Sequence, residues 1–162
     1  MDSITKLTKS QQEFYGEFIS FIHSELTNVF ILKGYAGTGK TFMIDVIIRF
    51  LESTGRSYRL MAPTGRAAKV IADKTGKPAY TIHKSIYSFE KMEIKKGKKS
   101  SFTYNYKVRS NDDKDDTVYI IDEASMISSN YSEAELFNFG SGKLLSDLFL
   151  FIHQGKLFPK RK

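Results

Sequence analysis

Apolar residues recur along this chain at two spacings, one typical of helices and one typical of strands. The segment Thr8–Leu26 has its apolar residues on one side of a helical projection, which predicts an amphipathic helix that starts near Thr8. The residues on that face are Phe14, Phe18, Phe21, Ile22 and Leu26.

Short runs of β-forming residues alternate with helical patterns over the rest of the chain. Three parallel strands are predicted, at Val29–Lys33, Ser57–Ala62 and Thr117–Ile121, the first of them buried. Helices are predicted at Thr38–Ser53 (ending at Gly55), Thr64–Asp73, Thr81–Tyr87 and, with a break at 140–142, over most of Ser132–His153. The residues of Thr64–Asp73 expected to face inward are Ala67, Ala68, Val70 and Ile71. This alternation predicts an α/β fold with a parallel sheet and flanking helices.

One segment departs from that alternation. Phe89–Ile94 and Ser101–Val108 are polar β-like arms around a turn-forming stretch, so we expect an antiparallel hairpin inserted at about residues 88–110. Alternation along the second arm places Phe102, Tyr104 and Tyr106 on one face. Seven basic residues stand against Glu90 and Glu93, a net charge of +5; they are Lys91, Lys95, Lys96, Lys98, Lys99, Lys107 and Arg109. The acidic run 111–116 that follows is expected to be a solvated loop.

Composition restricts the class of protein. With 162 residues, 41% of them hydrophobic, the chain has the size and apolar content of one folded domain. It contains no cysteine, no signal-peptide pattern and no apolar run long enough to cross a bilayer, so a cytoplasmic protein is expected. A net charge of +7 suggests an anionic partner such as nucleic acid, although the same charge could serve solubility alone.

The residues Gly34–Thr41 carry the clearest chemistry. They read G-x-x-x-x-G-K-T between a β-like run and a helical pattern, the context of a phosphate-binding loop for ATP. Glycines let the backbone approach phosphate, and amides at the start of the following helix can bind its oxygens. Lys40 would reach the terminal phosphates, and the Thr41 hydroxyl would ligate Mg²⁺. The expected nucleotide-binding residues also include Gly34, Ala36, Gly37, Thr38 and Gly39.

A second set of candidate residues follows the third predicted strand. Asp122 and Glu123 come directly after the apolar run 118–121, at the sheet edge where parallel sheets bind ligands. Asp122 would hold Mg²⁺, and Glu123 would orient and deprotonate the water that attacks the γ-phosphate. The alternative is an acidic pair that caps a helix N-terminus.

Taken together, these motifs resemble those of superfamily 1 DNA helicases of the RecD/Dda-like branch. The resemblance covers residues 7 to 127 in order and spacing. It is carried by Thr8-x-x-Gln11, the phosphate loop, Ala-Pro-Thr-Gly-Arg-Ala-Ala at 62–68, Thr-Ile-His at 81–83 and Asp-Glu-Ala-Ser-Met at 122–126. It implies a RecA-like P-loop fold, ATP and Mg²⁺ as cofactors, and single-stranded DNA or a single-strand/double-strand junction as partner.

The resemblance also implies roles for individual residues. Gln11 matches a glutamine that reads the adenine edge, although Thr8-x-x-Gln11 is also a helix capping box. Thr64 and Arg66 match a motif that grips DNA phosphates, with an ordinary helix start as the alternative, and His83 matches a DNA-contact motif but is equally a structural histidine. The hairpin takes the place of a strand-separating pin, where Lys95, Lys96, Lys98 and Lys99 would follow phosphates and Phe102, Tyr104 or Tyr106 would stack on a base. Its alternative is a solvated hairpin with its aromatic face packed on its own domain.

Part of the family pattern is absent from residues 1–162. Such helicases have a further strand ending in Gly-Asp-x-x-Gln, placed between the phosphate-loop strand and the Asp122 strand, and a second RecA-like motor domain. We therefore expect a truncated RecA-like motor domain with an incomplete sheet, weakly active or inactive alone, whose missing C-terminal motor half is needed for function. The alternatives are another P-loop ATPase acting on DNA, or a nucleic-acid-binding remnant without turnover.

Overall fold

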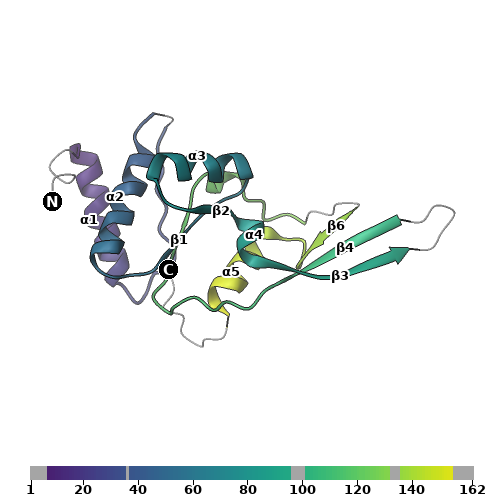
Figure 1. The fold of residues 1–162 in the computed structure, drawn as a ribbon. Coiled ribbons are helices and arrows are strands. Elements are labelled where there is room, and N and C mark those ends of the chain that lie inside the picture. Colours follow the sequence, from purple (N-terminus) through teal and green to yellow (C-terminus); the bar gives the residue numbers. More distant parts are fainter. Residues whose placement is uncertain (1–6, 36, 96–100, 132–135, 155–162) are drawn as a thin grey trace.

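The computed structural model describes residues 7–35, 37–95, 101–131 and 136–154, and Figure 1 shows their arrangement. The helices are α1 (Lys9–His23), α2 (Lys40–Ser53), α3 (Gly65–Thr75), α4 (Ile82–Ile86) and α5 (Leu144–His153), with a short 3₁₀ turn at Ala124–Met126. The strands are β1 (Tyr58–Ala62), β2 (Ala79–Thr81), β3 (Tyr87–Lys95), β4 (Ser101–Val108), β5 (Val118–Ile121) and β6 (Phe137–Phe139).

The strands form two sheets within the described residues. One is parallel, in the order β2-β1-β5, and has helices packed against it. The other has the order β3-β4-β6, and its β3–β4 hairpin projects away from the helices (Figure 1). This architecture confirms the predicted α/β P-loop fold with an incomplete sheet and an inserted hairpin. The division of the chain into domains stays a prediction.

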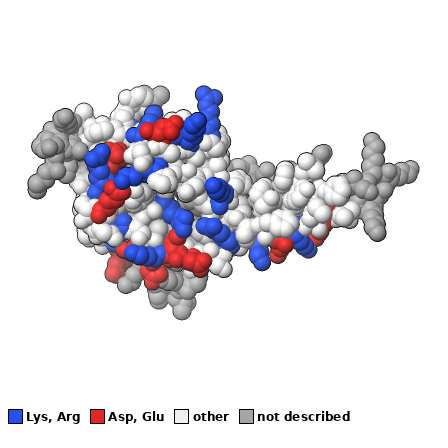
Figure 2. All heavy atoms as spheres, viewed as in Figure 1, with Lys and Arg blue, Asp and Glu red and all other residues white. Residues whose placement is uncertain are grey.

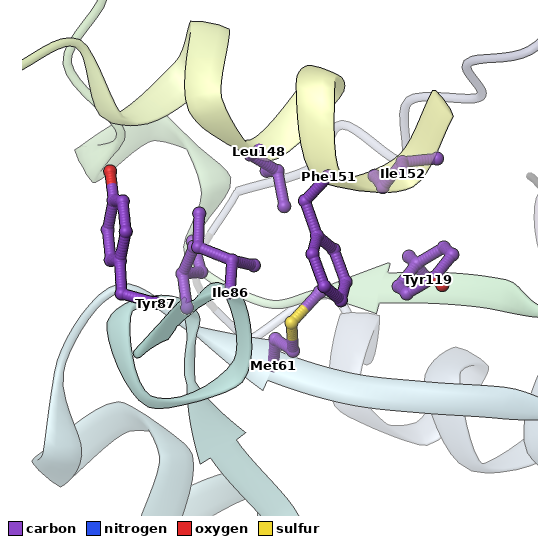
Figure 3. Close-up of a cluster of buried hydrophobic side chains, with 8 residues drawn as sticks. Met61, Ile86, Tyr87, Tyr119, Leu148, Phe151 and Ile152 are labelled. Carbon is purple, nitrogen blue, oxygen red and sulfur yellow. The ribbon is translucent and has the colours of Figure 1, made fainter. Parts of the chain in front are cut away.

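Both faces of the parallel sheet are packed. On one face, α5 places Leu148, Phe151 and Ile152 against Met61 of β1 and Tyr119 of β5 (Figure 3). On the other face, α1 and α2 enclose Val118, while Ile44 and Ile48 of α2 join Ile71 of α3 over Leu60. These buried side chains hold β1 and β5 in place, and the sheet edge that follows them is positioned by this core.

A buried carboxylate joins the hairpin to α5. Asp147 is 2% exposed and accepts hydrogen bonds from the Tyr87 hydroxyl at 2.6 Å and from the Ser141 amide at 3.0 Å. Burial and this carboxylate raise the pKa of Tyr87. Gly140 passes so close that a Cβ there would collide with the Asp147 carboxylate, so a side chain at 140 is excluded. The root of β3 is thereby tied to α5.

The segment Val29–Lys33 is not the buried strand that the sequence predicts. None of it lies in a strand, and no ladder joins it to β1 or β5. Phe30 and Leu32 pack inward against the α1 and α2 clusters, whereas Val29 and Ile31 are 53% and 66% exposed. Its side chains alternate between exposed and half-buried, as in a strand, but no described strand pairs with its backbone.

Two predicted helical faces are also corrected. Helix α1 ends at His23, and Leu26 beyond it is 94% exposed, so it does not share the apolar face. In α3, Ala68 and Ile71 are buried as expected, but Val70 lies on the exposed side. Both errors come from assigning one apolar residue to a face without knowing where the neighbouring element lies.

The helical prediction for Ser132–His153 is wrong over the described residues 136–143. Residues 132–135 lie outside the described part of the chain, 137–139 form β6, and α5 starts only at Leu144. Gly140 and Gly142 adopt positive φ, which ends β6 and delays the helix. Strand β6 pairs in parallel with β4, and β2 pairs in parallel with β1; at three residues each, both are too short to show a periodicity.

The acidic run 111–116 is only partly a solvated loop. Asn111 and Asp113 are half-buried, and Asp113 pairs with Arg59 of β1. Asn111 Nδ2 donates to the Tyr119 hydroxyl of β5 at 2.9 Å, and that hydroxyl donates to Asp113 at 2.8 Å, so side chains of the loop bind it to the sheet. The sequence predicts that the run is solvated, but two of its residues, Asn111 and Asp113, bind the loop to neighbouring elements.

The Tyr87–Asp147 hydrogen bond generates a stability prediction. Tyr87→Phe removes the donor and leaves a buried carboxylate short of one partner, so the free energy of unfolding should fall by about 1.5–3 kcal/mol. Tyr104→Phe is the matched control, because no hydrogen bond joins that hydroxyl to the described residues, and it should change stability by less than about 0.5 kcal/mol. Urea denaturation measures both; equal stability of the two variants would contradict the assignment.

Candidate nucleotide site and nucleic-acid surface

The phosphate loop ends in the tight turn that its glycines allow. Gly37 and Gly39 have φ of 80° and 85°, and Gly39 is the residue that caps α2. These values fall in the left-handed region, where a Cβ is strained. Helix α2 therefore starts at Lys40, two residues later than predicted, and its free N-terminal amides open toward the loop. Ala36 lies outside the described residues.

The side chain of Lys40 lies within this loop. Its Nζ donates to the carbonyl oxygens of Gly34 and Tyr35, both at 2.9 Å. Thr38 Oγ1 also donates to the Tyr35 carbonyl, at 2.8 Å. The ammonium group is thus placed at the mouth of the loop by backbone acceptors that a phosphate oxygen could replace.

Gly34 and Gly39 both mark close approaches around the loop. A Cβ at Gly34 would lie 2.7 Å from Thr38 Oγ1, so only glycine fits beside that hydroxyl. A Cβ at Gly39 would lie 3.0 Å from Gln11 Nε2, which places the Gln11 amide against the loop. Gln11 Oε1 accepts from the Thr8 amide at 3.0 Å, completing the capping box of α1. Gln11 therefore caps its helix and lies beside the loop, and its contact with adenine stays a prediction.

The residues expected to hold Mg²⁺ are the Thr41 hydroxyl and the Asp122 carboxylate. Among the described residues no group of three or more His, Cys, Asp or Glu could hold a metal ion by itself. A hydroxyl, one carboxylate, phosphate oxygens and water fit the hard oxygen ligands that Mg²⁺ prefers. The donor set is thus compatible with a magnesium ion brought in by the nucleotide.

Asp122 and Glu123 lie where β5 ends. The Asp122 amide donates to the Met61 carbonyl at 3.0 Å, so this residue continues the β1–β5 ladder. Asp122 is half-buried and Glu123 is exposed. Since β1 and β5 are parallel, both carboxylates lie at the carboxyl edge of the sheet, the ligand-binding edge of such folds.

Glu123 also has an unusual backbone. Its φ of 53° makes it the one non-glycine residue with positive φ in the part of the chain that is described. A left-handed conformation costs a residue with a Cβ about 1–2 kcal/mol. Such strain concentrates at functional sites, where it directs a side chain that a regular strand or helix would turn elsewhere. The sequence alone gave no signal of this conformation.

Thr64 and Arg66 are exposed at the start of α3. Thr64 Oγ1 accepts from the Ala67 amide at 3.2 Å and caps the helix, which leaves its hydroxyl hydrogen available to a ligand. Pro63 and Thr64 follow β1 directly, so this helix start lies at the same carboxyl edge as Asp122. The position suits a phosphate contact, and the capping role is present as well.

His83 packs into an aromatic cluster. Its ring centroid lies 4.9 Å from that of Phe139 and 5.6 Å from that of Tyr87. Burial lowers the pKa of His83, so the imidazole is neutral near pH 7. These contacts favour the structural role that the sequence left open.

The hairpin aromatics divide into two groups. Tyr104 stacks on Phe137 with ring centroids 5.6 Å apart and an interplanar angle of 24°. Tyr106 stacks on Phe139 with ring centroids 4.8 Å apart and an interplanar angle of 23°. Phe102 pairs across from Ile94, beyond the end of β6, and is 46% exposed. Strand β6, which the sequence did not reveal, thus occupies two of the three rings, and Phe102 is the ring most open to a base.

Charge along the hairpin is less one-sided than the sequence suggests. Lys91 forms an ion pair with Glu93 at 2.7 Å. The residues Lys96, Lys98 and Lys99 lie outside the described part of the chain, as does the Lys95 side chain. In Figure 2 the hairpin is mostly uncharged on the visible face, while Lys and Arg are mixed with Asp and Glu over the body.

Comparison with known proteins agrees with this geometry. Residues 6–138 match a family model described as an AAA domain. The chain belongs to this AAA domain family. It is 39% identical over 54 residues to the ATP-dependent RecD2 DNA helicase of Deinococcus radiodurans, covering 33% of this chain and 8% of the helicase. It is 40% identical over 78 residues to the ATP-dependent DNA helicase dda of Enterobacteria phage T4, covering 48% of this chain and 18% of that protein.

A third relative is an uncharacterised protein of Methanocaldococcus jannaschii, 35% identical over 102 residues, which are 60% of this chain and 8% of the relative. The matches confirm the resemblance of this AAA domain to the motor portion of RecD/Dda-like helicases. The matched region spans less than a fifth of each relative. In the described residues, no helix combines the length and apolar character needed to span a bilayer.

The strained backbone of Glu123 generates a second prediction. Glu123→Gly relieves the left-handed strain, and after the entropy that glycine adds to the unfolded chain, the free energy of unfolding should rise by about 0.5–1 kcal/mol. Glu123→Gln keeps the Cβ and should leave stability within about 0.5 kcal/mol of the original chain. Thermal unfolding of the three proteins measures this; destabilisation by glycine would show that Glu123 is held without strain.

Proposed function

We propose that this AAA domain binds Mg·ATP at the phosphate loop and is the ATP-binding part of an ATP-dependent DNA helicase. The observation that carries the proposal is the placement of Lys40 in a loop where Gly34 leaves no room for a side chain and Gly37 and Gly39 adopt positive φ. Lys40 Nζ lies 2.9 Å from two loop carbonyls, and a Cβ at Gly34 would contact Thr38 Oγ1. A cation held by weak backbone acceptors at a helix N-terminus is arranged for an anionic ligand.

Different residues around the loop contact different parts of ATP. Lys40 and the first amides of α2 bind the β- and γ-phosphates, and Gln11 beside Gly39 contacts the adenine. Thr41 and Asp122 hold Mg²⁺, which when bound neutralises charge between the phosphates. Glu123, exposed at the end of β5, orients water and takes its proton.

In the longer protein, we propose that this cycle drives movement along single-stranded DNA and separation of a duplex. Support comes from the similarity to two DNA helicases and from the exposed Thr64, Arg66 and Phe102. The first two residues suit phosphate contacts, and an exposed ring on a projecting hairpin suits stacking on a base. Arginines supplied by a second motor domain accelerate phosphoryl transfer by about 10³–10⁵, so residues 1–162 alone should hydrolyse ATP slowly and not unwind DNA.

Nucleotide binding tests the proposal directly. Lys40→Ala should weaken binding of a fluorescent ATP analogue in the presence of Mg²⁺ by at least about tenfold, because it removes charge-assisted hydrogen bonds to phosphate. Lys74→Ala removes an exposed charge of the same type at the end of α3 and should leave the affinity unchanged. Equal affinity in the two variants would remove the phosphate loop from the proposal.

Hydrolysis tests the role of Glu123. Glu123→Gln keeps the shape and the affinity for the nucleotide but loses the base, so ATP turnover should fall by about 10²–10⁴ from the rate of the unmodified chain. The measurement is phosphate release with and without single-stranded DNA. Measurable turnover in Glu123→Gln equal to that of the original chain would exclude Glu123 as the base.

The exposed ring of the hairpin gives a test of DNA contact. Phe102→Ala should weaken binding to single-stranded DNA by about 1–3 kcal/mol and leave the salt dependence unchanged, because stacking involves no counterion release. Ile94→Ala shortens the exposed cross-strand neighbour, which has no ring, and should have little effect. Equal losses in both variants would indicate general apolar contact instead of stacking.

A further inference from the structure

A pocket lies at the root of the hairpin, on the opposite sheet edge from the phosphate loop. Its volume is about 670 Å³, in the range of small-molecule sites. Residues from the sheet, the hairpin, the loop that follows it and α5 contribute to its walls. They include Arg59, Ser88, Lys107, Arg109, Asp113 and Phe151.

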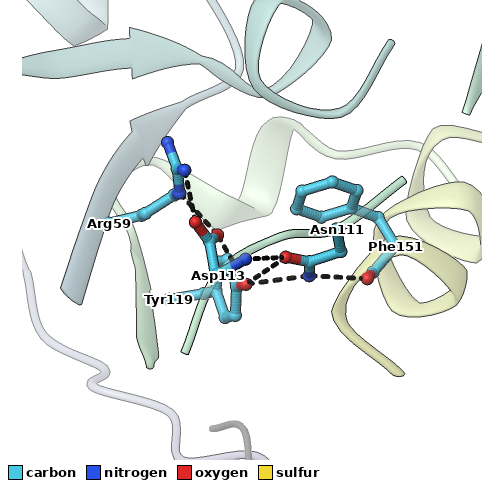
Figure 4. A network of polar contacts seen from close by, with 5 residues as sticks. All are labelled: Arg59, Asn111, Asp113, Tyr119 and Phe151. Carbon is cyan, nitrogen blue, oxygen red and sulfur yellow. Dashed lines mark hydrogen bonds and ion pairs between the residues drawn. The ribbon is translucent and has the colours of Figure 1, made fainter. Parts of the chain in front are cut away.

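One wall is fixed by a polar network (Figure 4). The Arg59 guanidinium makes two hydrogen bonds to the Asp113 carboxylate, which also accepts from the Tyr119 hydroxyl at 2.8 Å. Asn111 Nδ2 donates to the Phe151 carbonyl at 2.8 Å and binds the loop to α5. Arg59 and Asp113 therefore neutralise each other and shape the pocket rather than charging it.

The remaining cations come from β4 and the residue that follows it. Lys107 pairs across from Ser88 in the hairpin register, and Arg109 is held with its guanidinium carbon 5.7 Å from the centre of the Phe151 ring. Neither side chain forms an ion pair with a carboxylate among the described residues. The Nε atom of Arg109 is buried and has no hydrogen-bond partner among the residues that the structure describes. Asp112 is the one lining carboxylate besides Asp113, so two cations face one exposed anion.

We propose that this pocket binds a phosphate group, with Arg109 and Lys107 as its charged donors and Ser88 and Ser110 as hydroxyl donors. A planar guanidinium fixed over a ring presents its donors in the fork that phosphate oxygens accept, and an ammonium adds a movable point charge. The phosphate comes either from a nucleic-acid backbone or from a free anion.

The site is separate from the nucleotide loop. Arg59 pairs across from Tyr119, and Asp122 lies three residues further along the chain, which is about 10 Å at the rise of a strand. Because the pocket walls come from both the sheet and the hairpin, a bound phosphate would fix the hairpin relative to the motor domain. The pocket therefore offers a way for a phosphate contact outside the ATP site to orient the hairpin.

Residue-resolved NMR distinguishes this pocket from the phosphate loop. Inorganic phosphate and a short oligothymidylate are titrated separately into the labelled chain, and the amide signals of Ser88, Lys107, Arg109 and Ser110 are followed. At least one probe should shift these signals saturably. In Lys107→Gln the dissociation constant at these signals should rise about tenfold, while Lys74→Gln, an equal change of charge on α3, should leave it unchanged.

The two probes identify the source of the phosphate. Saturation by the oligonucleotide at lower concentration than by phosphate assigns the pocket to a nucleic-acid backbone, and saturation by inorganic phosphate alone assigns it to a free anion. Since Arg109 packs on Phe151 and its loss could disturb folding, Lys107→Gln decides the test. The absence of saturable shifts with both probes, or identical titrations in Lys107→Gln and Lys74→Gln, would overturn the proposal.

Discussion

The position of the phosphate loop depends on the hydrogen bonds that the backbone of Val29–Lys33, the segment before it, can form. Buried backbone groups must be hydrogen-bonded, and a loop that binds phosphate is normally held by a strand inside a sheet. Here Phe30 and Leu32 pack inward, but the segment has no ladder to β1 or β5 and its other side chains are exposed. The loop is therefore anchored on one side by α2 and on the other by side-chain packing alone.

This constraint connects the fold to the function. The core of α5, β1 and β5 is complete and fixes Asp122 and Glu123, whereas the segment before the loop lacks a neighbour. In the pattern expected from the RecD/Dda-like resemblance, a further strand would lie between these two parts; the matched region spans 8% and 18% of the two helicases. We propose that in the longer protein such a strand completes the sheet and sets the distance between Lys40 and Glu123.

The fold and the nucleotide motifs could be predicted because they depend on local sequence. Glycine spacing, the capping residues Thr8 and Thr64, and the apolar run before Asp122 each specify their structure within a few residues. The failures depend on distant neighbours. The pairing of Val29–Lys33 needs a strand that the described chain does not supply, and β6 exists because Phe137 and Phe139 stack on Tyr104 and Tyr106. No periodicity over three residues could show that contact.

The roles of charged and aromatic residues were predictable only in part for the same reason. Asp113 reads as a solvated charge until Arg59 is placed beside it, and the aromatic neighbours of His83 favour one of the two roles that the sequence left open. The left-handed backbone of Glu123 is a property of the turn after β5, not of its sequence. Contacts between elements thus decided which candidate residues remain open to a ligand.

Amide hydrogen exchange of the isolated chain tests the central claim, that the segment before the phosphate loop is unpaired while the neighbouring sheet is formed. The account predicts that the amides of Phe30, Ile31 and Leu32 exchange within about tenfold of the rate in unstructured peptides, whereas those of Leu60 and Ile120 are protected by several orders of magnitude. Protection of Ile31 equal to that of Leu60 would contradict it, because it would place Val29–Lys33 in the hydrogen-bonded sheet.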